Sequence, residues 1–135
     1  MYETHQKGEI ASCEVQRRAI EKGFIVSKPT TEARYDLLLD DGLKIHRVQV
    51  KYADAEGTDV DSTELDLRKE CRNNGKSKVY TKDEIDLVLV YVPRIDNVIC
   101  LGPELFHNRK TITVRFAPSG KYFGKKQHFA NDLIW

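Results

Sequence analysis

The beginning of the chain carries apolar residues at helical spacing. Between Glu3 and Lys22 they recur every three or four positions, and Gly23 follows them. This period is typical of an amphipathic helix, and a glycine directly after the last turn is a common C-terminal signal. We therefore expect a helix over this stretch. The apolar run at residues 24–28, which Pro29 stops, predicts a short strand.

Two further segments with strand-like composition flank the turn sequence Asp40-Asp41-Gly42. They cover residues 35–39 and 43–51. Asp-Gly between two such segments is a strong hairpin signal. The pattern therefore predicts two antiparallel strands joined by this turn.

The second half of the chain has the pattern of strands with little helix. Residues 86–92 are almost all apolar, as in a central strand buried on both faces, and Pro93 ends the run. Further elements are expected as strands at residues 64–67, 97–101 and 111–116, and as a short helix that begins at Pro103. The order of elements favours an α+β domain with a mixed sheet over a doubly wound one.

Length and composition fit one domain. The chain has 135 residues, of which 40% are hydrophobic and 32% charged, so we expect a single soluble domain over residues 1–135. Its three cysteines lack the spacing of zinc ligands, and no stretch has the pattern of a signal peptide or the length of a membrane span. These features predict a cytoplasmic protein without membrane contact. The histidines show no pairing that would predict zinc.

The charges are unevenly distributed between the two halves of the chain. Residues 1–70 carry 11 Lys and Arg against 15 Asp and Glu, whereas residues 71–135 carry 11 against 6. Such a division suits a phosphate-binding surface beside a carboxylate cluster that holds a metal ion. An ordinary solvated surface has the same composition, so charge leaves both interpretations open.

Strand geometry brings polar side chains together on the predicted hairpin. Because side chains alternate between faces, Gln49 and Lys51 point to the same side as Arg47. A two-residue turn at Asp41-Gly42 would place Asp36 opposite Arg47 and therefore on that side. A register shift of one residue would reverse this, so the prediction depends on the type of turn.

These groups match the needs of phosphodiester hydrolysis. The reaction needs oxygen ligands for a hard cation and a positive group near the attacking oxygen. The side chains of Asp36 and Gln49 and the carbonyl of Val50 are candidate metal ligands, and Lys51 is the candidate cation. A hairpin with one wet face also carries alternating polar residues, so the spacing alone leaves both interpretations open.

The same residues resemble a known family. Arg34-Tyr35-Asp36-Leu37 and Gln49-Val50-Lys51, with twelve residues between Asp36 and Gln49, are similar to the core of PD-(D/E)XK nucleases, in particular to small endonucleases related to group I intron homing enzymes. Lys7-Gly8-Glu9-Ile10-Ala11 and the segments 80–86 and 91–93 extend the likeness. The resemblance implies a restriction-endonuclease-like core, with an N-terminal helix on a mixed sheet and an antiparallel hairpin that carries the active site.

The resemblance also implies roles for individual residues. Asp36 would bind Mg²⁺, with Mn²⁺ as a substitute, and Lys51 would position or activate water. Glu9 would complete the metal shell, with Glu14 as the weaker candidate. The sequence departs from the wider superfamily at Gln49, where an acid is usual, and an amide binds metal less strongly. A non-cleaving DNA-binding module therefore stays open as an alternative.

Cations in several segments are candidates for DNA contact. The tail from residue 121 to 129 interleaves cations with aromatic residues, which suits phosphates and bases or, alternatively, a subunit contact. Residues from about 119 to 135 are accordingly interpreted as a DNA-binding or oligomerisation extension. The predicted DNA-binding residues are Arg34, Arg47, Arg72, Lys76, Lys78, Lys121, Lys125 and Lys126.

The leading hypothesis is a Mg²⁺-dependent endonuclease that makes double-strand breaks in DNA, with intron homing as its context. Because a duplex has two strands and the domain one site, a homo-oligomer, dimer or tetramer, is expected. A Holliday-junction resolvase or a restriction-type nuclease would share this core. No Gly-rich nucleotide-binding pattern is present, so no nucleotide cofactor is expected.

Overall fold

The computed structural model describes residues 2–54, 61–70, 76–118 and 126–135. Two α-helices and ten strands among these residues form an α+β fold, as the sequence predicted. In chain order they are α1 (Thr4–Glu21), β1 (Ile25–Ser27), β2 (Leu37–Asp40), β3 (Ile45–Tyr52), β4 (Ser62–Asp66), β5 (Arg68–Glu70), β6 (Ser77–Val79), β7 (Leu87–Val92), β8 (Asn97–Leu101), α2 (Pro103–Phe106), β9 (Thr111–Arg115) and β10 (His128–Phe129).

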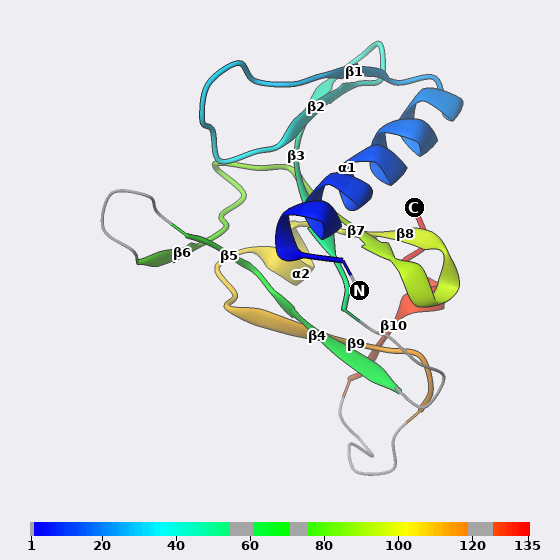
Figure 1. Ribbon diagram of the computed structural model, residues 1–135. Coiled ribbons are helices and arrows are strands. Elements are labelled where there is room, and N and C mark those ends of the chain that lie inside the picture. The colour runs from blue at the N-terminus through cyan, green and yellow to red at the C-terminus, as the bar shows by residue number, and fades with distance from the viewer. Residues whose placement is uncertain (1, 55–60, 71–75, 119–125) are drawn as a thin grey trace.

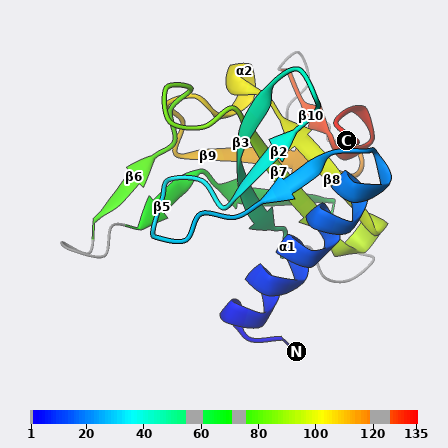
Figure 2. The same ribbon diagram turned by 90° about the horizontal axis from the view of Figure 1, so that it is seen from above.

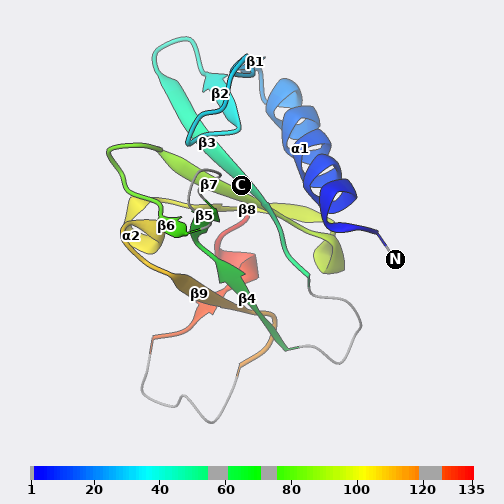
Figure 3. The same ribbon diagram turned by 60° about the vertical axis from the view of Figure 1, so that its left-hand side comes forward.

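The strands form three sheets. The largest has the order β1-β2-β3-β7-β8 and is mixed, because only β3 and β7 run parallel. A second sheet has the order β10-β9-β4, and β5 and β6 form a separate ribbon. Helix α1 covers one face of the large sheet and the β4–β9 pair lies on the other side (Figures 1 and 3). The β5–β6 ribbon projects from the side away from α1 (Figure 2).

Two apolar clusters hold these layers together. On the helix side, Val15 and Ala19 of α1 pack with Leu37, Leu39 and Val48 of the hairpin strands. On the opposite side, a larger cluster joins the large sheet to α2, β4 and β9. Strand β7 contributes to both clusters, so it is buried on both faces, as its apolar sequence predicted.

Helix α1 begins and ends where the sequence predicted. At its N-terminus the side chain of Gln6 accepts a hydrogen bond from the Glu3 N–H, and the Glu3 side chain accepts one in return from the first turn. At its C-terminus Gly23 adopts a φ of +90°, a left-handed conformation that glycine reaches without a Cβ clash.

The hairpin turn is longer than predicted. Asp40 pairs with Ile45, so residues 41–44 form the loop, and the Asp41 carboxylate accepts the N–H groups of Leu43 and Lys44 at 2.8 and 2.7 Å. The expected two-residue turn is therefore wrong, because this side chain closes a wider loop. The register shifts by two residues, so Arg47 lies opposite Leu38 and not opposite Asp36 as predicted.

Strand β3 changes its partners along its length. Up to Val48 it pairs with β2, and from Val48 to Tyr52 it pairs with β7. The last residues of β3 are therefore held by β7 on one edge, while β2 does not extend along the other edge. Within the described residues, this end of β3 thus has a strand partner on one edge and none on the other.

An ion pair secures the start of the β3–β7 pairing. The Asp86 carboxylate accepts hydrogen bonds from Arg47 at its backbone N–H (2.8 Å), its Nε (3.1 Å) and its terminal nitrogen (3.2 Å). The Asp86 N–H in turn donates to the Arg47 carbonyl at 2.8 Å. These bonds join the two strands at the point where their parallel pairing begins.

The end of the chain is part of the packed fold. The Trp135 N–H donates to the Val98 carbonyl at 2.9 Å, and the Cys100 N–H donates to the Leu133 carbonyl at 2.8 Å. The Trp135 ring packs against Phe24, with 5.8 Å between ring centroids. Residues 126–135 of the segment interpreted as an extension are therefore integrated with the sheet. No helix among the described residues has the length and apolar character needed to span a bilayer.

The Arg47–Asp86 pair predicts a pH-dependent stability. Burial opposes ionisation of Asp86, but hydrogen bonds from Arg47 outweigh it and lower the pKa of the carboxyl. The resulting stabilisation is fully present above the ordinary pKa of about 4 and is lost as pH falls through the lowered value. Asp86→Asn should therefore lower the free energy of unfolding by roughly 1–3 kcal/mol at pH 7, and the difference should shrink below about pH 4.

Urea unfolding of both proteins between pH 3 and 7 measures this difference. Asp83→Asn is the matched control, because it removes a nearby charge while Arg47 bonds only the Asp83 backbone carbonyl. A loss in Asp86→Asn that is equal at pH 3 and pH 7 would contradict the ion-pair interpretation.

Candidate active site

Asp36 lies just before β2, at the open edge of β3. Its N–H donates to the Val48 carbonyl at 2.8 Å, although Val48 is already the cross-strand partner of Leu37. Asp36 and Leu37 thus both lie opposite Val48, which is the arrangement of a β-bulge. Simple alternation therefore does not determine where the Asp36 side chain points, and its contacts do.

Those contacts place the Asp36 carboxylate beside β3. Its Oδ2 accepts a hydrogen bond from the Val50 N–H at 3.0 Å. Together with the bond to Val48, this fixes Asp36 to the two residues on either side of Gln49. Asp36 is also near enough to Lys51 to affect its pKa.

A cleft of about 390 Å³ opens where Asp36 faces the first turns of α1. Asp36, Val50 and Glu9 line it, and Lys28, which lies outside the sequence motif, contributes a cation. Glu9 is exposed and follows Gly8 on the helix. The structure therefore brings Glu9 and Asp36 to one cleft, although they are 27 positions apart in the printed sequence.

Glu14, the alternative to Glu9, has other partners. Its carboxylate forms ion pairs with Arg17 and Arg18 on the same helix. Arg18 also donates to the Asp96 carbonyl at 2.9 Å, so these groups tie the helix to the turn after β7. Of the two glutamates, the geometry favours Glu9 as the residue beside Asp36.

The residues around Asp36 fit a divalent cation with oxygen ligands. Within a strand, the N–H and C=O of one residue point to the same edge. Because the Val50 N–H reaches Asp36, the Val50 carbonyl also points to the edge that β2 leaves open. Gln49 is only 6% exposed, and its Oε1 has no hydrogen-bond partner among the described residues. An unpaired buried oxygen is costly unless a ligand satisfies it.

The donor set contains few carboxylates. Within the described part of the chain, no group of three or more His, Cys, Asp and Glu side chains is arranged to hold a metal ion. The candidate ligands are therefore two carboxylates, from Asp36 and Glu9, with the Val50 carbonyl and the Gln49 amide. Mg²⁺ is commonly held by one or two carboxylates together with water and substrate phosphates, so this set fits Mg²⁺.

Lys51 points to the same face of β3 as Gln49 and is half-buried there. Its Nζ donates to the Arg68 carbonyl at 3.3 Å. Burial lowers the pKa of the ammonium, and the nearby Lys69 and Arg34 also lower it, while Asp66 and Asp36 oppose the change. Burying a cation costs stability, which is expected of a residue kept for chemistry rather than packing.

Tyr80 supports Lys51 and was not selected from the sequence. Its ring lies 5.2 Å from the Lys51 Nζ and 5.1 Å from the Arg34 guanidinium carbon, so two cations share one aromatic ring. The residue is fully buried, and its hydroxyl has no hydrogen-bond partner among the described residues. Burial raises the pKa of this hydroxyl. A tyrosine before a polar turn carries no sequence signal for this role.

Two of the predicted DNA-binding arginines have partners within the chain. Arg34 donates to the Glu84 carboxylate at 2.7 Å and to the Val79 carbonyl at 2.9 Å, and Arg47 binds Asp86. Both therefore hold the segment before β7 against the hairpin. The other predicted residues in the described part are exposed, namely Lys76, Lys78 and Lys126. Arg72, Lys121 and Lys125 lie outside the described residues.

Comparison with known proteins identifies a family and a fold. The family model for PD-(D/E)XK endonucleases matches residues 2–132. A solved structure of a bacterial homing endonuclease, I-Ssp6803I, is similar with a TM-score of 0.74 at 22% sequence identity, covering 98% of this chain and 89% of that one. At this identity the likeness shows the fold, and it confirms the predicted restriction-endonuclease-like core. None of the curated proteins matches the chain.

The environment of Tyr80 predicts an unusual mutational result. Because its buried hydroxyl has no partner, Tyr80→Phe should leave the free energy of unfolding unchanged or raise it by up to about 1 kcal/mol. Tyr91→Phe is the matched control, since the Tyr91 hydroxyl donates to Asp96 at 2.8 Å and its loss should cost roughly 0.5–1.5 kcal/mol. Urea unfolding of both variants makes the comparison, and a loss in Tyr80→Phe as large as in Tyr91→Phe would contradict it.

Proposed function

Because the chain belongs to the PD-(D/E)XK endonuclease family, we propose that it is a Mg²⁺-dependent DNA endonuclease centred on Asp36, Gln49 and Lys51. The observation that carries the proposal is the bond from the Val50 N–H to Asp36 at the open edge of β3. This bond holds Asp36, the acid of the family motif, beside Val50, between Gln49 and Lys51. On the residue before Val50, the buried Gln49 Oε1 has no hydrogen-bond partner among the described residues and is available to a ligand.

The residues that would hold the metal ion are Asp36, Glu9, Gln49 and Val50. Asp36 and Glu9 supply charge, and the Gln49 Oε1 and the Val50 carbonyl supply neutral oxygens. Bound there, Mg²⁺ would supply positive charge to the oxygens of the scissile phosphate. The amide in place of an acid lowers the affinity for the ion, so occupancy would depend on the substrate phosphate.

Lys51 would act on the attacking water and on the phosphate. Its Nζ would hold the water by a hydrogen bond and face the phosphate with its positive charge, while the Tyr80 ring and the Arg68 carbonyl keep it in place. Lys69 and Arg34 add positive potential around this position. Such a field attracts a polyanionic substrate and stabilises charge that develops on the phosphate.

We propose double-strand cleavage by a homo-oligomer, in the context of intron homing. One domain carries one such site and a duplex has two strands, so two copies are needed to cut both. The likeness to a bacterial homing endonuclease supports this context over others. Junction resolution and restriction share the core, and the amide at Gln49 keeps a non-cleaving DNA-binding module as the second candidate.

Cleavage assays on supercoiled plasmid, long linear DNA and a four-way junction test the proposal. Cutting should require Mg²⁺ or Mn²⁺ and stop in EDTA. Lys51→Met should lower the cleavage rate by about 10²-fold or more, because the group that holds the water is lost. Its free energy of unfolding should not fall, because methionine fills the same space without the cost of a buried cation.

Lys44→Met is the matched control, since Lys44 is an exposed lysine of the hairpin loop. It should cleave at the wild-type rate. The preferred substrate separates homing or restriction activity from junction resolution. Salt-sensitive DNA binding without metal-dependent cleavage of any of these substrates would reject the nuclease in favour of the DNA-binding module.

A further inference from the structure

A second pocket lies on the three-stranded sheet. It has a volume of about 270 Å³ and runs along β9, between Arg109 before the strand and residues 126–128 near the chain end. Strand β10 pairs with β9 only at Val114 and Arg115. The edge of β9 at residues 111–113 therefore has no strand partner on this side among the described residues, and the pocket occupies that edge.

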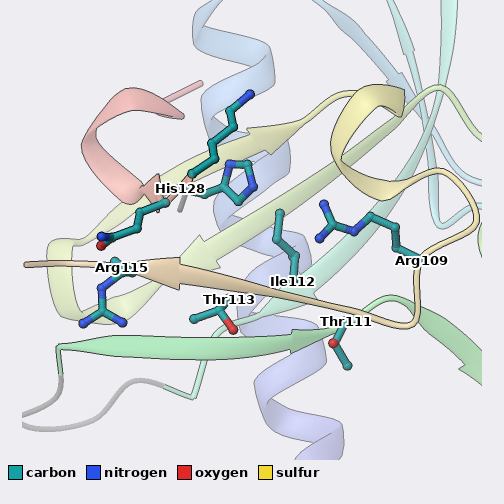
Figure 4. Close-up of a pocket in the computed structure, with 8 residues that line it drawn as sticks. Arg109, Thr111, Ile112, Thr113, Arg115 and His128 are labelled. Carbon is teal, nitrogen blue, oxygen red and sulfur yellow. The ribbon is translucent and has the colours of Figure 1, made fainter. Parts of the chain in front are cut away.

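Basic side chains surround this pocket. Arg109, Lys126 and His128 line it, and no carboxylate does among the described residues. Figure 4 shows Arg109 and His128 extending toward each other over Ile112, while Arg115 points away from them. The side chains of Arg109 and Lys126 have no hydrogen-bond or ion-pair partner within the described residues. Two unpaired cations beside an imidazole form a site for an anion.

The pKa of His128 reflects the positive charge around the pocket. Burial lowers the pKa of His128, and the charges of Arg109 and Lys126 lower it further. The positive charges of Arg109 and Lys126, which disfavour a proton on His128, also attract an anion to the pocket. An anion bound in the pocket would offset their repulsion and raise the pKa of His128.

We propose that this pocket binds a phosphate group, held by Arg109, Lys126 and His128. Its three basic side chains, which reach the pocket from separate positions, suit a tetrahedral anion. The phosphate belongs either to the DNA backbone, which rests on the proposed function, or to free inorganic phosphate. The pocket lies on the β9 layer, across the large sheet from α1 and its cleft, so this phosphate is not the one that is cut (Figure 3).

Two binding measurements on the full chain in EDTA test the proposal. In the first, inorganic phosphate is titrated while the pKa of His128 is followed by NMR. In the second, the affinity for a duplex of about 25 base pairs is measured from 50 to 300 mM salt. The variant is Arg109→Gln with Lys126→Gln, and the control is Lys44→Gln with Lys82→Gln, which removes the same charge from exposed residues outside the pocket.

A phosphate group in the pocket predicts that phosphate raises the pKa of His128 in the wild type and in the control but not in the variant. If the phosphate comes from DNA, the variant should also bind the duplex more weakly, with a slope of log affinity against log salt smaller by about 0.9 for one lost contact. An unchanged DNA affinity with the NMR response present assigns the site to free phosphate.

Two results would overturn the proposal. One is the absence of both the NMR response and the change in slope. The other is an equal loss in variant and control, which would show a general effect of charge. Because neither measurement needs cleavage, failure of the proposed nuclease activity leaves both readouts intact. The charge-conserving variant, Arg109→Lys with Lys126→Arg, should bind phosphate as the wild type does.

Discussion

The structure depends on strand β3, which pairs with β2 along its first half and with β7 along its second half. Its first half is held by β2 and its second half by β7, and only Val48 pairs with both. The parallel β7 fixes residues 49–52 while their other edge stays open. Asp36 uses that edge, through Val48 and Val50. A rigid strand with one free edge can therefore present backbone and side-chain oxygens to a ligand without losing its place in the sheet.

Support for the site comes from groups that are themselves held in place. The Arg47–Asp86 pair joins β3 to β7 at the start of their pairing. From the same segment before β7, Tyr80 places its ring beside Lys51 and Arg34. Arg34 in turn binds Glu84, close to the start of β7. Residues 80–86 thus both secure the pairing of β3 with β7 and hold Lys51 in place.

Much of the fold could be predicted because its main elements are long and periodic. Helix α1, the hairpin and β7 follow from apolar spacing, and Gln49 and Lys51 share a face because side chains alternate along β3, whatever the register of the hairpin. The division into three sheets could not be predicted, since β5, β6 and β10 are only two or three residues long and mostly polar. Tyr80 was missed because its role comes from tertiary contacts, and the roles of Asp36, Gln49, Lys51 and Glu9 stay predictions.

The most direct test of the metal site is a crystal structure of the protein grown with Mn²⁺, which stands in for Mg²⁺ and can be located by its anomalous scattering. The proposed site predicts a peak at the open edge of β3, about 2.1 Å from an oxygen of Asp36 and from the Val50 carbonyl. The Gln49 Oε1 should turn toward the same peak. Mn²⁺ bound elsewhere on the protein, with no peak between Asp36 and Val50, would contradict the proposed metal site.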